Sequence, residues 1–259
     1  MIDALMDTPH HWKYIDDCTV GITINNDSPN YSPLQNILDC LQIWTRENHV
    51  TINQNKTVVM HVCTSTTPVP SPVVTIGSHS LHVVESTKLL GVTIDNELDW
   101  KLHTTNTIQA STYRLHMLKT MKSLGALHQQ LRDIYTTFIL PKLTYASPDW
   151  SSALNTTQMC WLERVQKRAC RIILEPAYTT YQQALIVLNL SSRKERYPHD
   201  LTMFGERLLS QPRHRLLLPS ALPPPSRATR RYNKLKPLIN GKNRHVEEQP
   251  NTYYCKYYQ

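Results

Sequence analysis

The spacing of apolar residues changes near Trp100, and this change limits the chain to a β-rich part followed by a helical part. Before it, short runs of Val, Ile and Thr are separated by turn residues, which is typical of strands. After it, apolar residues recur every three or four positions, as in amphipathic helices. The pattern predicts an α+β fold: a small antiparallel sheet with one helix over residues 1–100, helices over 101–211, and a weakly ordered, proline-containing basic tail over 212–259.

The β-rich part should open with a hairpin. The runs Trp12–Ile15 and Thr19–Ile24 flank Asp16–Cys18, which predicts carboxylates at the hairpin tip. Apolar residues at helical spacing from Leu34 to Trp44 predict one helix, with Ser32 as its N-cap. Further strands are expected at 57–62, 73–76, 81–84 and 88–94, with a turn at Gly77-Ser78.

The helical part should contain at least five helices, and one of them carries a strongly cationic face. The expected ranges are 104–124, 129–145 with an interruption near Pro141, 157–174, 181–188 and 193–209. The helix over 157–174 has an apolar stripe made of Met159, Leu162, Val165, Ala169 and Ile172 or Ile173. Its other side carries four cations, Arg164, Lys167, Arg168 and Arg171.

Charge is distributed unevenly along the chain. Residues 1–160 hold 10 Lys and Arg against 13 Asp and Glu, a net charge of −3, whereas residues 161–259 hold 18 against 7, a net charge of +11. A basic half of this kind is typical of contact with a phosphate backbone. The alternative is that these charges only solvate helix faces and a tail, and charge alone does not separate the two.

Composition disfavours secretion and a membrane location. No run approaches the roughly 18 apolar residues of a membrane span, and the first residues lack a basic segment followed by an apolar one. The six cysteines form no C-x-x-C pair and no zinc-finger spacing. We therefore expect reduced thiols in a cytoplasmic or nuclear protein.

The acidic hairpin is the one place where the residues themselves indicate chemistry. Asp16 and Asp17 are adjacent carboxylates on a tight turn, and carboxylates are the ligands that Mg²⁺ prefers. Two such ions can stabilise a phosphoryl displacement, but two adjacent Asp residues cannot surround both, so another strand must add a carboxylate. An ordinary surface turn remains the alternative.

The surroundings of this hairpin resemble a known family. The stretch from Trp12 to Val20, with Tyr14-Ile-Asp-Asp17, is similar to the Tyr-x-Asp-Asp hairpin of non-LTR (LINE-type, jockey-like) retrotransposon reverse transcriptases. The segment Val50–Met60 resembles the family's Asn-x-x-Lys-Thr segment, and Leu89–Asp95 resembles its primer-grip hairpin. The helices over 131–150 and 162–169 are similar to its thumb and connection. The resemblance implies an RNA-directed DNA polymerase palm and thumb that binds an RNA template and a DNA primer.

The resemblance also implies roles for the matching residues. Asp16 and Asp17 would be catalytic, metal-binding carboxylates for Mg²⁺, and Lys56 would lie near the incoming triphosphate. Tyr14 would lie near the primer terminus. The primer grip would be formed by Leu90, Gly91 and Val92, although an ordinary buried hairpin and a solvated lysine explain these residues equally simply.

The family's fingers and first catalytic Asp precede the Tyr-x-Asp-Asp hairpin, and here only thirteen residues precede Tyr14. We therefore expect a fragment that is inactive by itself, with the other polymerase half missing and the hairpin left as an uncovered sheet edge. A second hypothesis is a sequence-independent nucleic-acid-binding helical module. A remote third is an AlkB-type repair-protein N-terminal-like domain, for which His245-Val-Glu247 is the only ligand-like pair of an iron oxygenase.

Overall fold

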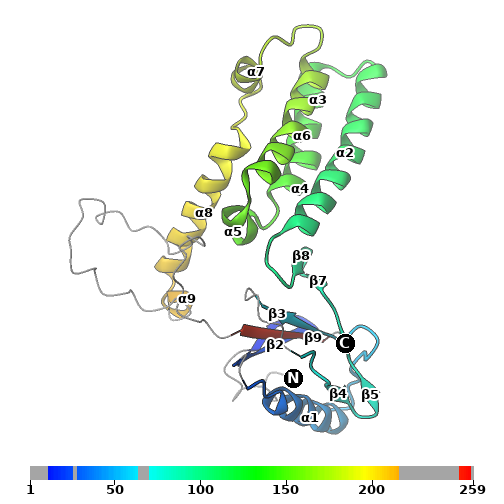
Figure 1. The fold of residues 1–259 in the computed structure, drawn as a ribbon. Helices are drawn as coiled ribbons and strands as arrows, with labels where there is room; N and C mark the ends of the chain where they lie inside the picture. The colour runs from blue at the N-terminus through cyan, green and yellow to red at the C-terminus, as the bar shows by residue number, and fades with distance from the viewer. Residues whose placement is uncertain (1–10, 26–27, 64–69, 216–250, 258–259) are drawn as a thin grey trace, which may run out of the picture. The chain divides into compact units, whose positions relative to one another are not determined.

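The computed structural model describes residues 11–25, 28–63, 70–215 and 251–257, the last of these as backbone only. The chain divides into two compact units, which are drawn in Figure 1. The first comprises residues 1–102 and 244–259 and contains the described strands, and the second comprises residues 103–243 and is helical in its described part, which ends at residue 215. An α+β fold is confirmed at this level. The division falls two residues beyond the expected boundary at residue 100.

The first unit is built on a five-stranded sheet with the order β1-β2-β9-β3-β6. Its strands are β1 (His11–Tyr14), β2 (Asp17–Ile24), β3 (Val58–Val62), β6 (His82–Val83) and β9 (Asn251–Tyr257). Neighbouring strands are antiparallel except for β3 and β6, which are parallel, so the expectation of a purely antiparallel sheet was wrong at that edge.

Strand β9 corrects two expectations about the chain. The tail over 212–259 was expected to be weakly ordered, yet Asn251–Tyr257 form a strand inside the sheet. The acidic hairpin was expected to be an uncovered edge. Of its two strands, β1 does lie at an edge of the sheet, whereas β2 is covered because β9 pairs with Cys18–Ile24. A strand contributed from the far end of the chain leaves no local pattern that sequence reasoning could detect.

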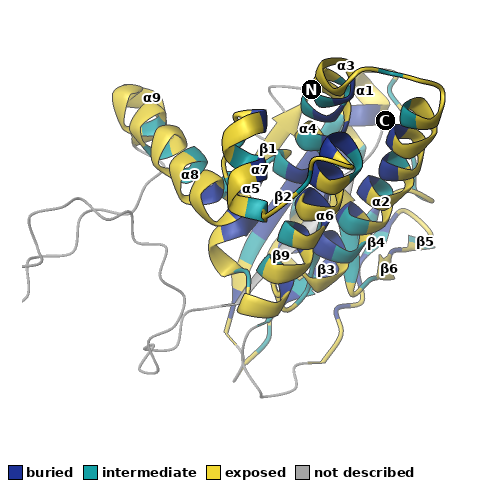
Figure 2. Ribbon diagram, turned by 90° about the horizontal axis from the view of Figure 1, so that it is seen from above, coloured by how far each residue is buried: buried dark blue, intermediate teal, exposed yellow. Residues whose placement is uncertain are grey.

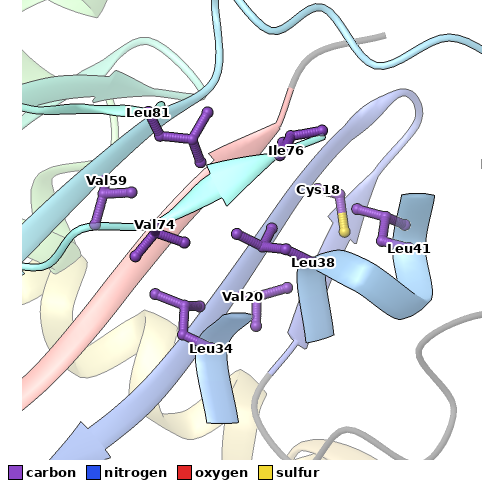
Figure 3. Close-up of a cluster of buried hydrophobic side chains, with 9 residues drawn as sticks. All are labelled: Cys18, Val20, Leu34, Leu38, Leu41, Val59, Val74, Ile76 and Leu81. Atoms are coloured by element: carbon purple, nitrogen blue, oxygen red, sulfur yellow. The ribbon is translucent and has the colours of Figure 1, made fainter. Parts of the chain in front are cut away.

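Helix α1 (Ser32–Glu47) covers one face of this sheet and supplies three of the nine residues of its buried core. Leu34, Leu38 and Leu41 recur at helical spacing and are almost fully buried. They pack on the buried cluster shown in Figure 3, which also contains Cys18, Val20, Val59, Val74, Ile76 and Leu81. The N-cap is Tyr31 rather than Ser32, which is the first helical residue and donates its backbone N–H to Asn30 Oδ1 at 3.0 Å.

Two small hairpins complete the first unit. One pairs β4 (Thr75–Ile76) with β5 (His79–Ser80) around the expected turn, where Gly77 has φ +61°. Gln42 of α1 supports this turn, since its Oε1 accepts the backbone N–H of Gly77 at 3.1 Å. The other pairs β7 (Ser86–Leu89) with β8 (Val92–Asp95), so the expected strand over 88–94 is in fact two strands and a turn.

The second unit consists of helices joined by short connections. They are α2 (Lys101–Ser123), α3 (His128–Ile134), α4 (Leu140–Thr144), α5 (Ser147–Trp150), α6 (Thr156–Leu174), α7 (Tyr181–Leu188), α8 (Arg193–Ser210) and α9 (Pro212–Arg215). The predicted end of α2 is confirmed: Gly125 has φ +90° and donates its N–H to the carbonyl of Lys122 at 3.0 Å.

Proline explains the interruption between α3 and α4. A π-helical turn, Tyr135–Ile139, connects the two helices immediately before Pro141. Proline has no N–H and its ring clashes with the carbonyl four residues earlier, so a regular α-helical ladder cannot continue through it. The predicted interruption is therefore confirmed, and its form is a widened turn.

Helix α6 separates its faces as predicted, with buried residues along one side and exposed residues along the other (Figure 2). Leu162, Val165, Ala169 and Ile173 are buried, and Asn155 caps the helix by accepting the N–H of Gln158 at 2.8 Å. Among the described residues, no helix is long and apolar enough to cross a membrane.

Candidate functional site

The β1–β2 hairpin presents the two carboxylates at an exposed tip. Tyr14 pairs with Asp17, which leaves Ile15 and Asp16 as a two-residue turn. Ile15 has φ +55° and its side chain is 74% exposed, so an apolar β-branched residue occupies a left-handed position in solvent. Asp16 is therefore a turn residue, whereas Asp17 is the first residue of β2 and is half-buried.

The β7–β8 hairpin is also closed by a two-residue turn whose first residue has a positive φ. Leu89 pairs with Val92 around the two-residue turn Leu90–Gly91, and both turn residues have positive φ, +47° and +88°. Leu90 is 43% exposed, whereas Val92 is buried. Glycine at position 91 is required by the turn itself, and no close approach to a ligand is needed to explain it.

A cavity of about 440 Å³ is lined by both hairpins and by β3. The first hairpin contributes Trp12, Tyr14 and Asp17, the second contributes Leu89, Leu90 and Ile94, and β3 contributes Val58 and Met60. Its volume is within the range of small-ligand pockets. The cavity brings together three of the predicted site residues, Tyr14, Asp17 and Leu90. It does not include Asp16, Lys56, Gly91 or Val92.

Lys56 lies at the same end of the sheet as Asp17. It is exposed in the turn that precedes β3, where its backbone N–H donates to Asn53 Oδ1 at 3.2 Å. Because β2 and β3 are both antiparallel to β9, they run parallel to each other and begin at the same end. Thr19 and Val58 share one partner in β9, Lys256, and Asp17 and Lys56 each precede that pair by two residues. Because β9 lies between β2 and β3, these two strands are two strand spacings, about 10 Å, apart.

The four predicted cations of α6, which are Arg164, Lys167, Arg168 and Arg171, all lie on its exposed face. Two of them are held by aromatic rings. Lys167 Nζ lies 5.1 Å from the ring centroid of Tyr181, and Arg171 Cζ lies 5.5 Å from that of Tyr178. Such contacts favour one orientation of a long side chain without neutralising its charge. The second unit thus presents a positively charged helix face on which two of the four cationic side chains are oriented by aromatic rings.

The described residues do not by themselves fit a magnesium-dependent polymerase centre. Among them, no group of three or more His, Cys, Asp or Glu side chains gathers in a way that could hold a metal ion. Asp16 and Asp17 supply two carboxylates, and a two-ion site needs more. Magnesium binding therefore stays a prediction, and it would require at least one carboxylate in addition to Asp16 and Asp17. The pair His245 and Glu247 lies outside the described residues.

A buried polar network in the second unit was missed by sequence reasoning. Gln166 is fully buried: its Oε1 accepts the hydroxyl of Tyr135 at 2.9 Å, and its Nε2 donates to the carbonyl of Ser191 at 2.8 Å and to Tyr181 Oη at 3.1 Å. Tyr181 also donates to Glu163. Gln166 occupies the stripe of Leu162 and Ala169, so a polar residue at an apolar position was the available signal.

Arg193 lies at the edge of this network and is 1% exposed. Its Nη2 donates to the carbonyl of Ser191 at 3.0 Å, and its backbone N–H donates to Glu163 Oε2 at 2.9 Å. Its Nε and Nη1 have no hydrogen-bond partner in the described part of the chain. Since a buried guanidinium normally needs more hydrogen bonds than this, Arg193 is the least satisfied part of the core.

The pKa values of the tyrosines in and beside this network indicate a structural role for it. Burial raises the pKa values of Tyr135 and Tyr197, and burial together with the hydrogen bond to Glu163 raises that of Tyr181. Burial also raises the pKa of the Cys170 thiol to about 12. These groups stay protonated at neutral pH, so none of them is an activated nucleophile or base. The cysteines with described side chains, Cys18, Cys40, Cys63, Cys160 and Cys170, are free thiols.

Comparison with known proteins adds no relative. No protein-family model matches the sequence, and no curated protein and no solved structure matches it significantly.

Proposed function

We propose that this chain is the palm and thumb portion of an RNA-directed DNA polymerase of the non-LTR retrotransposon kind, and that alone it binds nucleic acid without extending a primer. The observation that carries the proposal is the cavity between the two turn-bearing hairpins. Tyr14 and Asp17 of one hairpin and Leu90 of the other line the same cavity. These three residues belong to the two sequence segments that resemble the catalytic hairpin and the primer grip.

Within this proposal, Asp17 faces the reacting phosphates, and Tyr14 and Leu90 position the primer terminus from the cavity. The roles of Asp16 at the metal, of Lys56 at the triphosphate and of Gly91 and Val92 in the primer grip rest on the resemblance alone, because these four residues do not line the cavity. Within this proposal the chain alone does not extend a primer, because the resemblance matches neither the family's fingers nor its first catalytic Asp.

Photocrosslinking tests this proposal directly. An RNA–DNA hybrid whose primer ends in 4-thiothymidine is bound to the full chain, irradiated and mapped by mass spectrometry. Crosslinks within residues 11–17 and 86–95 are expected, because these hairpins line the cavity. Crosslinks confined to α6 would contradict the polymerase assignment and favour the second candidate. Primer extension that requires Mg²⁺ and disappears in Asp16→Ala would contradict the inactivity of the chain.

The second candidate is a sequence-independent binding module based on the exposed cations of α6. Neutralising about four phosphates predicts that affinity falls about 100-fold between 50 and 200 mM salt. Replacing the four cations of α6 by Gln should weaken binding and flatten this salt dependence. A matched variant neutralises four exposed cations elsewhere, Arg46, Lys119, Lys194 and Arg207. Equal losses in both variants would show that only net charge matters.

A further inference from the structure

A second cavity, of about 250 Å³, lies at the end of α1 and is called the α1 cavity below. It is enclosed by the last turns of α1, by the loop over residues 50–54 and by Ile76 of β4. Figure 1 shows β4 and β5 beside this helix. None of its described lining residues belongs to the cavity between the hairpins, so a ligand bound here is independent of the proposed function.

The β4–β5 turn holds the side-chain amide of Gln42 in one orientation. Gln42 Oε1 accepts the backbone N–H of Gly77 at 3.1 Å, so Nε2 is the half of the amide that is left to donate. A Cβ at position 77 would lie 2.9 Å from this Nε2, which shows that the amide packs directly on the glycine. Within the described part of the chain, Gln42 Nε2 has no acceptor.

Gln54 is oriented by the neighbouring residue of the same hairpin. Its Nε2 donates to the carbonyl of Ile76 at 3.3 Å, which leaves its Oε1 as an acceptor. The two glutamines that line the α1 cavity therefore offer one donor and one acceptor, and the backbone of β4 and its turn fixes both. Polar groups that are already fixed lose little conformational freedom when a ligand binds.

Arg46 supplies a positive charge at the same cavity. It is exposed in the last turn of α1 and forms no ion pair with any residue that the structure describes. The C-terminal end of a helix by itself disfavours an anion. Here, however, the carbonyls of residues 44–46 accept the N–H groups of residues 48–50. The described lining contains neither Asp nor Glu, so its charge favours an anionic ligand.

The rest of the contact surface is largely aliphatic. Ile76 is 2% exposed and belongs to the buried cluster of Figure 3, and Val50 and Ile52 are half-buried. The volume of the cavity is below the usual range for drug-sized ligands, which limits the ligand to about a dozen non-hydrogen atoms.

We propose that the α1 cavity binds an aliphatic carboxylate with an adjacent N–H group, which is the chemistry of the C-terminal residue of a polypeptide. The carboxylate accepts hydrogen bonds from Arg46 and from Gln42 Nε2, and the N–H donates to Gln54 Oε1. The aliphatic side chain packs on the three aliphatic residues of the lining. Inorganic phosphate would match Arg46, but it would place an anion against Gln54 Oε1 and leave the aliphatic residues uncovered.

The probe is N-acetyl-L-leucine, and N-acetyl-L-leucinamide is its neutral control. Their binding to the full chain is measured by titration with saturation-transfer difference NMR. The acid should bind with a dissociation constant of about 1 mM, as expected for a ligand of about 12 non-hydrogen atoms. The amide should bind about tenfold more weakly, because charge-assisted hydrogen bonds are the stronger ones. Equal binding of the two ligands, or no binding of the acid, would overturn the proposal.

Variants assign the charge that is recognised. Arg46→Gln should weaken binding of the acid about tenfold and leave binding of the amide unchanged. Lys101→Gln is the matched control, since it removes the same charge at an exposed position of the same unit. It should bind both ligands as the wild type does. Equal losses in the two variants would show an effect of net charge alone and would contradict recognition by Arg46. Gln42→Leu tests the oriented donor separately and should also weaken binding of the acid severalfold.

The position and the source of the ligand are tested with the same probe. Nuclear Overhauser effects from the leucine methyl groups should reach Ile76. Effects that reach Ile94 instead would place the ligand between the hairpins and would overturn the assignment to the α1 cavity. The peptide acetyl-Gly-Ser-Gly-Leu distinguishes the two sources of this chemistry. Binding at least as tight as that of N-acetyl-L-leucine supports a polypeptide C-terminus, whereas binding tenfold weaker would restrict the cavity to small carboxylates.

Discussion

The two units of this protein achieve stability in different ways. The helical unit encloses a polar network whose members, from Tyr135 to Tyr197, come from one continuous stretch of about sixty residues. The sheet unit takes a central strand from residues 251–257, more than 180 residues after β3. Contacts between distant parts of a chain cost more loop-closure entropy than local ones, so they form later and more slowly. The comparison indicates that the sheet unit depends on closing a long stretch of chain, whereas the network of the helical unit is closed within a short one.

The largest effect on the helical unit is expected from replacing Trp150, an aromatic residue in its core. Trp150 is fully buried, and its ring lies 5.1 Å from His103 and 5.3 Å from Tyr197. Its Nε1 donates to the carbonyl of Tyr145 at 3.0 Å. Trp150→Ala should lower the free energy of unfolding by about 3–5 kcal/mol, measured by urea denaturation. Trp161→Ala, at a position 38% exposed, is the control and should cost far less.

The corresponding test of the sheet unit removes one donor from β9. Tyr254 pairs with Gly21 on one side and Met60 on the other, so proline there cannot be accommodated in the middle of the sheet. Tyr254→Pro should destabilise the sheet by up to about 3 kcal/mol, because it removes a backbone donor and leaves a buried carbonyl unsatisfied. It should also raise hydrogen exchange in β2 and β3, while α2 and α6 stay protected. Asn251→Pro, at the first residue of the strand, should be nearly neutral. Loss of protection in both units would contradict their independence.

The stability of the helical unit should also depend on pH, with an expected effect smaller than that of Trp150→Ala. Burial, with a smaller contribution from the charge of Lys142, lowers the pKa of His103 to about 4. Since an unfolded histidine titrates near 6.5, the unfolded state binds the proton first as the pH falls. Stability contributed by neutral His103 is therefore complete above about pH 6.5 and is lost toward pH 4, with about 2 kcal/mol gone by pH 5.

Thermal unfolding at pH 7.5 and pH 5.0 checks this expectation against His103→Gln, which should lose much less stability over that interval. Asp149 acts in the opposite direction, because burial raises its pKa and favours its protonated form. It is present in both proteins, so it cancels in the comparison. Parallel pH profiles for the two proteins would exclude His103 as the source of the pH dependence.

The smallest effect is expected at the centre of the polar network. Gln166→Leu removes the acceptor of the Tyr135 hydroxyl and the donor to the Ser191 carbonyl, and the network has no side chain to replace it. An unsatisfied buried hydroxyl costs about 1–2 kcal/mol, which chemical denaturation resolves. Gln129→Leu, at an exposed position of α3, is the control. A stabilised Gln166→Leu protein would show that apolar packing outweighs the network.

Local patterns in the sequence predicted most of the elements correctly. The alternation of Val, Ile and Thr around Asp16, the apolar spacing of α1 and α6, and the breaks at Gly125 and Pro141 all act over a few residues. For this reason, α7 was predicted at its observed ends, and α6 began one residue earlier than expected. The turn at Leu90–Gly91 was not predicted from the local pattern, which indicated one strand over residues 88–94. No pattern in the sequence indicated the cavity lined by Tyr14, Asp17 and Leu90, because it joins two hairpins that are distant in the chain.

By itself, the sequence determined the α+β division, the hairpin with its two carboxylates, the helix with its cationic face and the uneven charge, because each depends on neighbours within one or two turns of chain. Only the tertiary structure decided that Asp17 and Lys56 lie at the same end of a sheet, that Gln166 and Arg193 are buried together, and that β9 lies between β2 and β3. These depend on the pairing of distant segments. A backbone edge accepts any extended strand of the correct direction, so seven residues near the C-terminus left no mark on the sequences of the strands they join.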